Sequence, residues 1–333
     1  MINEFKKLLY FFKIQNKKKR IFFLENNFSK KHLEPYFKKN NNIDKSIIIS
    51  LGNDLKIRNE YNIEVLYFKN KFVLYILFLF LKVRYCYSTT PDLGYTLFAK
   101  SIHNTTKYIY IQHSQISLLK AYRFNAFKYF DTIQVCNSFQ REEVYFLQKK
   151  FKRKIKPFKI KNLFLKNFNI NQKKNSFDIL IAPTWNTDFF QDQVILNLIK
   201  VLAKNYSIKI RPHYMSVLKD QSYKKNFHHF EQFVFKEDLN FYDFKILISD
   251  WSGIFLEYSL ITKKKSILIN TKQKINNEKS NINFPISIEE HSRKHLSSIV
   301  DINSIKKIPE LIKKNTFDKE DEVVKSYLDK YFY

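Results

Sequence analysis

Residues 246–258 read ILISDWSGIFLEY, and this stretch decides the fold of the second half of the chain. ILIS is apolar without alternation, which is typical of a strand buried on both faces, and a helix-like segment follows it. The chain has only three glycines and two tryptophans. Its many Lys, Asn, Ile, Phe and Tyr residues indicate an AT-rich codon bias, under which scarce residue types persist where a physical need holds them. Trp251 and Gly253 therefore mark this strand exit as a candidate site.

The first half of the chain shows a repeated order of strands and helices. Continuously apolar runs predict strands at 46–52, 63–68, 83–89, 107–113 and 131–137, and helix-like segments lie at 70–82, 93–103 and 138–151. Strand, helix and strand in this order indicate βαβ units and a parallel sheet.

A basic, Asn-rich stretch at 149–176 interrupts this order and is interpreted as a linker. The order then restarts, with strands expected at 177–183, 207–213, 233–235, 244–250 and 266–270, helices at 188–204 and 253–261, and a helical tail from 283. The sequence thus predicts an α/β protein with two doubly wound domains. We expect them at 1–160 and 177–315, joined by a linker at 161–176 and followed by a C-terminal helix at 316–333.

Composition limits the class of protein. The 44% hydrophobic content supports folded cores and argues against general disorder. The net charge of +28 is typical of proteins that bind nucleic acid or anionic membranes. The codon bias that favours Asn and Phe also favours Lys, however, so part of this charge is expected on an ordinary solvated surface. A phosphate-rich substrate or an anionic leaflet fits the remainder at least as well as RNA.

The cysteines and apolar runs indicate a cytoplasmic protein. Cys86 and Cys136 lie in strand-like contexts without C-x-x-C spacing, so we expect two buried free thiols and neither a zinc site nor a disulfide. Residues 1–20 lack the apolar core of a secretory signal. The apolar run 72–81 has ten residues, about half of the roughly 20 that span a bilayer, and predicts a buried helix, with a membrane-dipping element as the alternative.

Polar residues gather where predicted strands end, which is where open α/β sheets bind ligands. Both tryptophans lie at these exits, together with one glycine and two of the eight histidines. The four exits are His113-Ser114, Pro183-Thr184-Trp185, Arg211-Pro212-His213 and Asp250-Trp251-Ser252-Gly253.

The residue types at the second-half exits suit a phosphate. The first amides of the helix after Gly253 form an anion site, to which Ser252 adds a hydroxyl, and a glycine permits close backbone approach. Arg211 and His213 can donate hydrogen bonds to phosphate oxygens, and Pro212 fixes the angle at which His213 projects. An ordinary helix cap and a surface turn are the structural alternatives.

The remaining exits complete this interpretation. Thr184 supplies another hydroxyl, and Trp185 and Trp251 are expected to form pocket walls. His113 lies in the first half, so it would face the phosphate site across a cleft and accept a proton from an acceptor hydroxyl. A purely structural histidine is the alternative. The other histidines show no metal-ligand spacing, and the chain has no Walker A, G-x-G-x-x-G or G-x-S-x-G motif.

In this order, QHS, APTW, RPHY and SDWSGIFLEY resemble the motifs of the CDP-glycerol glycerophosphotransferase family, bacterial enzymes that prime or polymerise teichoic acids and related wall and capsule polymers. The resemblance implies a GT-B-type fold with two facing Rossmann-like domains, and neither a metal nor a cofactor. It implies that His113 is the catalytic base and that Thr184, His213 and Ser252 bind the donor phosphates. Asp250 and Glu257 would contact the nucleotide, with Glu257 at a ribose hydroxyl.

The chain departs from the family pattern at two positions. Ser114 replaces the usual glycine after the histidine, and Tyr214 stands where a proline often follows RPH. The Cβ of Ser114 would lie near the cleft and alter the acceptor, and related proteins in capsule loci act on other nucleotide-linked donors. The donor is therefore left open among glycerol, ribitol and sugar derivatives.

Three functions remain as hypotheses. The first is transfer of glycerol phosphate from a CDP-linked alditol donor to a hydroxyl of a polysaccharide or lipid-linked acceptor, with release of CMP. The second is glycosyl transfer from a nucleotide sugar by the same fold. The third is a basic protein that binds nucleic acid or a membrane surface, which leaves the strand exits unexplained.

Attachment to a membrane is a separate hypothesis. Residues 1–20 contain LLYFF followed by KKKR, a pattern that favours a peripheral contact with the anionic inner face of the cell membrane. A solvated helix is the alternative.

Overall fold

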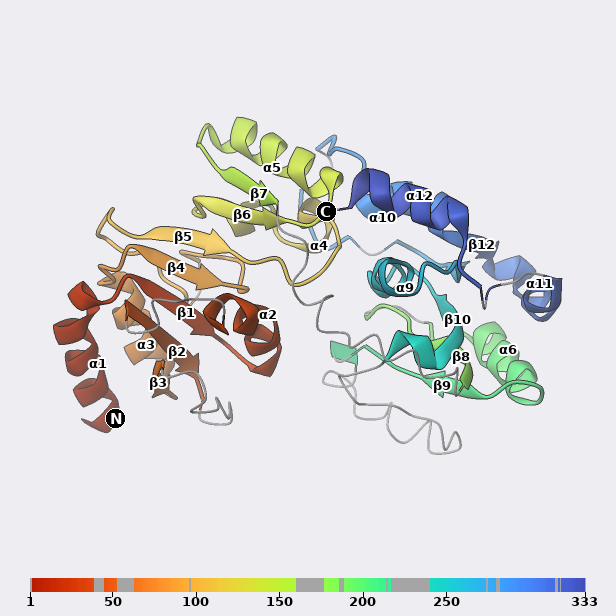
Figure 1. The fold of residues 1–333 in the computed structure, drawn as a ribbon, viewed down its shortest axis with the longest axis horizontal. Helices are drawn as coiled ribbons and strands as arrows, with labels where there is room; N and C mark the ends of the chain where they lie inside the picture. Colours follow the sequence, from red (N-terminus) through yellow and green to blue (C-terminus); the bar gives the residue numbers. More distant parts are fainter. Residues whose placement is uncertain are drawn as a thin grey trace.

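A computed structural model gives the structure of the protein and describes residues 2–38, 45–52, 63–95, 97–159, 177–185, 189–213, 215–216, 240–273, 275–279, 282–314, 317 and 319–332. Within these residues the strands form two parallel sheets of seven and five strands, each covered by helices. The predicted α/β fold with two facing doubly wound units is confirmed. The part built on the seven-stranded sheet is called the first lobe, and the other part the second lobe (Figure 1).

The first lobe has the strand order β3-β2-β1-β4-β5-β6-β7. Its strands are β1 Arg20–Leu24, β2 Ser46–Leu51, β3 Glu64–Phe68, β4 Tyr85–Ser88, β5 Lys107–Tyr110, β6 Thr132–Val135 and β7 Lys156–Lys159. Its helices are α1 Ile2–Ile14, α2 Asn27–Lys38, α3 Lys71–Leu79, the short α4 Leu118–Ala121, and α5 Ser138–Phe151.

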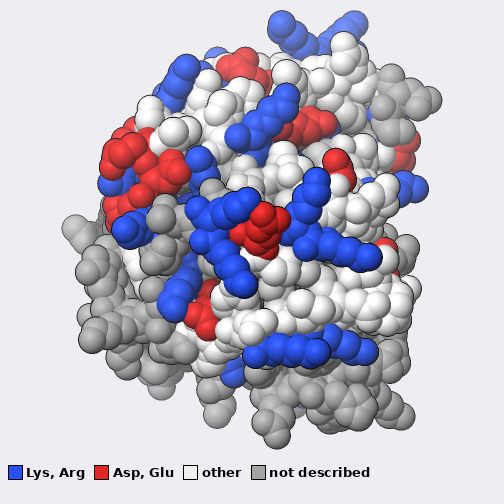
Figure 2. Space-filling model, turned by 90° about the vertical axis from the view of Figure 1, so that its right-hand side faces the viewer, with Lys and Arg blue, Asp and Glu red and all other residues white. Residues whose placement is uncertain are grey.

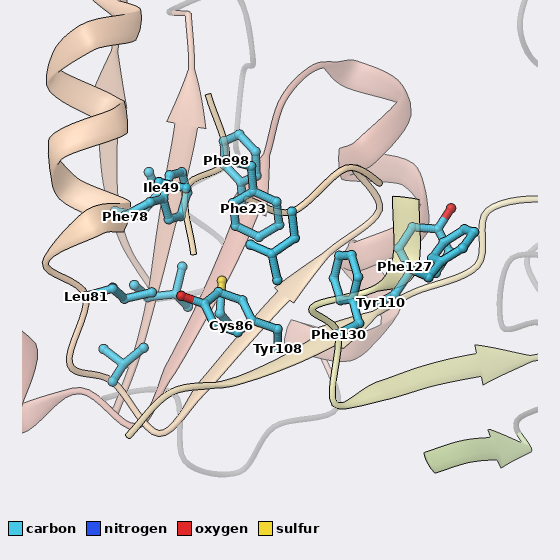
Figure 3. Close-up of a cluster of buried hydrophobic side chains, with 14 of the residues drawn as sticks. Phe23, Ile49, Phe78, Leu81, Cys86, Phe98, Tyr108, Tyr110, Phe127 and Phe130 are labelled. Carbon is cyan, nitrogen blue, oxygen red and sulfur yellow. The ribbon is translucent and has the colours of Figure 1, made fainter. Parts of the chain in front are cut away.

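Both faces of this sheet are buried, which explains why its strands are apolar without alternation. Ile21 and Phe23 point into a core on one face, and Phe22 and Leu24 into a core on the other. The first core is rich in aromatic rings: Phe98 packs against Phe23, Phe78, Tyr108 and Phe130 (Figure 3). Cys86 lies in this core as a buried free thiol, and Cys136 is also buried and free, as predicted.

The second lobe has the strand order β12-β11-β10-β8-β9. Its strands are β8 Phe177–Ile181, β9 Ile208–Ile210, β10 Phe244–Ser249, β11 Ser266–Asn270 and β12 Ser297–Asp301. Its helices are α6 Gln193–Ala203, α9 Ile254–Thr262, α10 Ile288–Leu296, α11 Ile308–Lys314 and α12 Glu322–Tyr331. Cores lie on both faces, as in the first lobe, because neighbouring residues of β8 point to opposite sides.

Some predicted elements were wrong and others were missed. The expected helix at 93–103 does not form in its described residues. Asp92 and Gly94 adopt positive φ angles of 62° and 86°, which a helix does not allow. The backbone also lies close to Tyr129, because a Cβ on Gly94 would be 2.8 Å from its ring. β7 lies in the stretch that was interpreted as linker, and β12 interrupts the tail that was expected to be helical. α1, β1 and α2 were not predicted as a unit. The expected strand at 233–235 and the linker at 161–176 lie outside the described residues.

No helix among the described residues is both long and apolar enough to cross a bilayer. The run at 72–81 forms α3, whose residues Val73, Leu74, Leu77 and Phe78 are buried in the first-lobe core. The buried-helix prediction for this run is therefore confirmed.

The lobes meet through α4 and the end of the chain. Ser117 N–H donates to Glu289 Oε1 (3.0 Å) across the contact, and Lys120 forms an ion pair with Glu290. After α12 the chain returns to the first lobe, where Phe332 pairs with Asn137 (Figure 1). These contacts set the distance between the two sets of strand exits.

A buried carboxyl group lies beside this contact. Glu143 of α5 accepts hydrogen bonds from the Ser117 hydroxyl and from Leu118 N–H (2.7 Å). Burial raises the pKa of Glu143 from 4.5 to about 8, while the hydrogen bond from Ser117 and the charge of Lys120 lower it, and nearby Glu289 raises it. The carboxyl group is thus expected to keep its proton at neutral pH inside the fold and to lose it near pH 8.

We predict that Glu143→Gln stabilises the protein at pH 8 more than at pH 5.5. The folded state binds more protons than the unfolded chain between pH 4.5 and about pH 8, so the Glu143 contribution to stability falls as pH rises through this window. One pKa unit corresponds to about 1.4 kcal/mol, so the difference in Tm between variant and wild type should grow by at least about 3 °C. Thermal unfolding at both pH values measures this. The neighbouring exposed Glu142→Gln is the control, and a gain equal to this control would contradict the prediction.

Candidate functional site

The second sheet has its crevice between β8 and β10. β9 lies on one side of β8, whereas β10, β11 and β12 lie on the other, so the strand order reverses at this point. Ligands of open parallel sheets bind at such a point, beyond the carboxyl ends of the strands. Thr184 follows β8 and Asp250 follows β10, so both lie at this crevice.

Asp250 ties these two strand exits together. Its Oδ1 accepts hydrogen bonds from Thr184 N–H (2.8 Å) and Ser252 N–H (3.2 Å). Burial raises the pKa of Asp250 to about 6, although both hydrogen bonds lower it. Its Oδ2 is buried and has no hydrogen-bond partner within the part of the chain described. Asp250 therefore shapes the crevice directly, and its contact with a nucleotide stays a prediction.

Trp251 packs toward the β11 side of this crevice. Its indole Nε1 donates to Thr271 O (2.8 Å), and the Arg293 guanidinium stacks 3.9 Å from its ring centroid. Arg293 also donates to Asp250 O (2.9 Å), so it fixes Trp251 and the strand exit at once. Burial lowers the pKa of Arg293 to about 10, yet it remains charged at neutral pH. Arg293 was not predicted as a site residue, because it lies on α10, outside the four strand exits.

The start of α9 contacts the first lobe. A Cβ on Gly253 would lie 2.4 Å from Ile116 Cγ2 and 3.3 Å from Ser114 Oγ. The glycine is thus required by a close approach of the loop after β5, a reason that the sequence did not reveal. The buried Ser252 hydroxyl accepts from Ile254 N–H (3.5 Å), but the N-cap residue of α9 is Gly253, which has no side chain to cap the helix.

The exit of β9 brings His213 beside Trp185, with ring centroids 6.3 Å apart. His213 Nδ1 accepts the N–H of Met215 (3.2 Å), so in a neutral ring Nε2 carries the proton. The Nε2–H group can therefore donate a hydrogen bond to a phosphate oxygen.

Glu257 lies between charges from both lobes. Burial raises the pKa of Glu257, while the positive charges of Arg211 and of Lys31 lower it. Arg211 follows β9, and Lys31 belongs to α2 of the first lobe. The structure thus brings Glu257 and Arg211, two residues of the predicted site, near each other. It also places Lys31 there, a residue that the sequence did not indicate.

His113 is half-buried after β5, among aromatic side chains. Its Nε2 lies 3.0 Å from Tyr122 Oη and its Nδ1 3.3 Å from Tyr110 Oη. Burial lowers the pKa of His113 to about 4, partly offset by a hydrogen bond to the Thr89 backbone. The imidazole is therefore neutral at pH 7 and able to accept a proton.

His32 of α2 is a further imidazole at this place. Its ring centroid lies 5.9 Å from that of His113, and burial, with smaller effects of His113 and Lys31, lowers its pKa well below the usual range. His32 was not predicted as a site residue, because the histidines other than His113 and His213 show no metal-ligand spacing. The signal that could have found it is its place after β1, a strand that was not predicted.

The four exits therefore converge. The loop that carries His113 touches Gly253, Thr184 is bonded to Asp250, Trp185 adjoins His213, and Arg211 and Glu257 interact. Whether these residues bind a donor or act in catalysis remains a prediction.

Known proteins share the fold of this chain. No family model and no curated protein matches its sequence. Two structures of the wall teichoic acid polymerase TagF, both of a histidine-to-asparagine variant and one soaked with CDPG, match with TM-score 0.57 and 15% identity. These matches cover 99% of this chain and 92% and 93% of the polymerase chains.

A second kind of enzyme has the same architecture. The UDP-N-acetylglucosamine 2-epimerase from Rickettsia bellii matches with TM-score 0.52 and 10% identity over 94% of this chain and 95% of the other. At identities this low, the structural matches establish a common fold and nothing beyond it. They agree with the GT-B-type fold that the motif resemblance implied.

We predict that Gly253→Ala destabilises the contact between the lobes and that Ile116→Ala restores it. The added methyl would overlap Ile116 Cγ2, and such overpacking costs about 1–3 kcal/mol. Ile116 Cβ lies 3.9 Å away, so removing Cγ2 relieves the overlap and leaves the 3.3 Å approach to Ser114 Oγ as the closest contact. Urea unfolding of both single variants and the double variant should give a favourable coupling of about 1–2 kcal/mol. Additive effects would show that Ile116 does not fill this space.

Proposed function

We propose that the protein transfers glycerol phosphate, or a related alditol phosphate, from a CDP-linked donor to a hydroxyl of a polysaccharide or lipid-linked acceptor. The observation that carries this proposal is the contact of the His113 loop with the start of α9. We infer that this contact brings a neutral imidazole of one lobe near a helix N-terminus of the other, as a general base and a phosphate site require.

In this reaction the acceptor oxygen attacks the β-phosphorus of the donor. A new P–O bond forms, the acceptor proton passes to His113, and the bond from the β-phosphorus to the bridging oxygen breaks. CMP leaves with that oxygen and its electron pair. His213 Nε2–H, the Thr184 and Ser252 hydroxyls, Arg211 and the first amides of α9 would hold the charge on the two phosphates.

Supporting geometry comes from the donor side. His213 is held as a donor by Met215, and Trp185 lies beside its ring. Asp250 presents one buried oxygen that lacks a donor among the described residues, and Glu257 lies near two cations. Hydroxyl groups of a ribose would satisfy such acceptors.

Glycosyl transfer from a nucleotide sugar is the second candidate. It is favoured by the common fold with an epimerase named for a UDP-linked sugar. Here the acceptor would attack the anomeric carbon and a nucleoside diphosphate would leave. A nucleic-acid binder is not proposed, because it would leave the convergence of the four strand exits unexplained. On the face that Figure 2 shows, acidic side chains lie among the basic ones.

We predict that the purified protein releases CMP when given CDP-glycerol and a hydroxyl acceptor. His113→Ala should lower turnover by about 10²–10³-fold with little change in donor Kd, because a general base acts on the acceptor. Ser252→Ala should also raise the donor Kd. His103→Ala, in the connection between β4 and β5, is the control. Release of a nucleoside diphosphate from nucleotide sugars would favour the second candidate. Full activity of His113→Ala would refute the assignment of His113 as the general base.

We also propose a peripheral contact of α1 with an anionic membrane. Ile2, Phe5 and Leu9 recur at helical spacing and are 76%, 38% and 61% exposed. The neighbouring stripe carries exposed lysines at positions 6, 13 and 17. Apolar side chains beside lysines suit an interface of acyl chains and anionic headgroups.

α3 extends this apolar surface. The Glu4 carboxylate accepts Lys69 N–H (2.5 Å) and Asn70 N–H (2.8 Å), and the rings of Phe12 and Phe80 lie 6.4 Å apart, so α1 and α3 run side by side in the same direction. The large exposed side chains on α3 and just after it are Phe72, Tyr75 and Phe80.

We predict that the protein floats with phosphatidylcholine vesicles that contain phosphatidylglycerol, and that Phe5→Glu with Leu9→Glu reduces the bound fraction at least about tenfold. Two acidic side chains would oppose both burial and headgroup charge. Val194→Glu, at an exposed position of α6, should not change flotation. Equal flotation of the Phe5/Leu9 double variant and wild type would exclude this surface.

A further inference from the structure

The loop 111–117, which joins β5 to α4, carries His113 and touches the second lobe. The side chains of Ser114 and Ile116 in this loop lie against Gly253 at the start of α9. The carbonyl groups of residues 114–116 belong to neither a strand nor a helix, so no regular ladder supplies them with donors. A carbonyl group that loses its water and gains no donor is costly. Side chains of another element must therefore hold this part of the loop.

Two amide side chains at the start of α5 supply the donors. Asn137 Nδ2 donates to Gln115 O (3.2 Å). Gln140 Nε2 donates to Ser114 O (3.3 Å) and to Ile116 O (2.9 Å). Both amide side chains are fully buried, and together they bind three consecutive carbonyl groups of the loop.

The oxygen atoms of the same two amides are bonded to backbone N–H groups at the helix start. Asn137 is the N-cap of α5, and its Oδ1 accepts Gln140 N–H (2.9 Å). Gln140 Oε1 accepts Cys136 N–H (2.8 Å). A backbone N–H binds only the oxygen end of an amide, and a carbonyl only the nitrogen end, so each side chain has one orientation. In that orientation both amide nitrogens face the loop.

The sequence of α5 brings these groups to one face of the helix. Asn137, Gln140 and Glu143 recur every third residue, a spacing that places helical side chains side by side. Glu143 continues the row, because it accepts Leu118 N–H (2.7 Å) where the loop enters α4. A polar face of α5 is therefore directed at residues 114–118.

The hold on the loop extends to the backbone of His113. Gln112 Nε2 donates to Ile116 O (3.5 Å), the carbonyl that Gln140 also binds, and Gln112 Oε1 accepts His113 N–H (3.1 Å). A displacement of the Ile116 carbonyl would thus be passed to His113 through a single side chain.

The second lobe fixes the start of α5 as well. Phe139 packs against the second-lobe core, with its ring centroid 5.3 Å from that of Tyr331, and Phe332 pairs with Asn137. The loop is therefore placed relative to the second lobe in two ways, directly at Gly253 and indirectly through α5. Such a double reference suits a group that must stand at a set distance from α9.

We propose that Asn137 and Gln140 are positioning residues, which hold the carbonyl groups of residues 114–116 and thereby set the distance of His113 from the start of α9. The proposal rests on the proposed function, in which His113 acts on a group bound at α9. Amide donors suit this place because they add no charge to a contact in which Glu143 and Glu289 are already buried.

Asn137→Asp and Gln140→Glu test the hold on the loop. Each introduced carboxylate still accepts the backbone N–H that the amide oxygen accepts, so the helix cap is kept, but it offers the loop carbonyls no donor. Hydrogen–deuterium exchange of residues 111–118 in the full chain should become at least about fivefold faster in both variants. Gln148→Glu, the same change at a half-exposed position further along α5, is the control. Unchanged exchange in both variants would overturn the hold.

Turnover shows whether the hold places His113. Well below the Tm of each variant, kcat for CMP release should fall by about 10²-fold in Asn137→Asp and Gln140→Glu, because a displacement of about 1 Å costs this much. The donor Kd should change little, since the proposed donor groups lie on the second lobe. A lower Tm or faster exchange with wild-type kcat would show a merely structural role and refute the positioning.

The proposed function fails by a different result. Wild-type protein that releases no CMP from CDP-glycerol, but a nucleoside diphosphate from nucleotide sugars, would refute it. The loss of kcat in both variants should then appear in the sugar reaction, and its absence there would overturn the positioning role.

Discussion

The close packing of Gly253 against Ile116 is the constraint on which the site depends. The start of α9 and the loop after β5 approach so closely that a single methyl group on Gly253 would overlap Ile116. The residue before Ser114 in this loop is His113, so the same contact sets how far the imidazole stands from α9. A change of less than a bond length here would alter the distance between base and donor, to which rates are sensitive.

Buried polar groups around this contact make the arrangement specific. Asp250 joins two strand exits by accepting backbone N–H groups, and Arg293 holds its carbonyl from α10. Glu143 and Glu289 meet at Ser117 from opposite lobes. Asp250 and Arg293 are bonded within the second lobe, whereas the hydrogen bond from Ser117 to Glu289 crosses the contact and forms only when both lobes are in place. Stability of the lobe contact and geometry of the site are therefore linked.

The fold leaves the chemistry open, because a teichoic acid polymerase and a sugar-nucleotide epimerase share it. The side chains at the strand exits bear on the reaction. A neutral His113 beside two tyrosines suits proton transfer from a hydroxyl, and His213 is held as a hydrogen-bond donor. A proton acceptor on one lobe and a hydrogen-bond donor on the other suit the proposed phosphoryl transfer and suit glycosyl transfer from a nucleotide sugar as well.

The sequence by itself determined the parallel sheets, the two units and the four strand exits. Apolar runs such as 244–250 reveal buried strands because burial on both faces removes the polar alternation. It missed β1, a five-residue run after a basic segment, because short apolar runs carry no decisive period. Only the tertiary structure decided that Gly253 packs against Ile116 and that the Tyr122 hydroxyl contacts the His113 ring. Gly253 and Ile116 come from different lobes, and His113 and Tyr122 come from irregular segments on either side of α4, so no local pattern in the sequence encodes either contact.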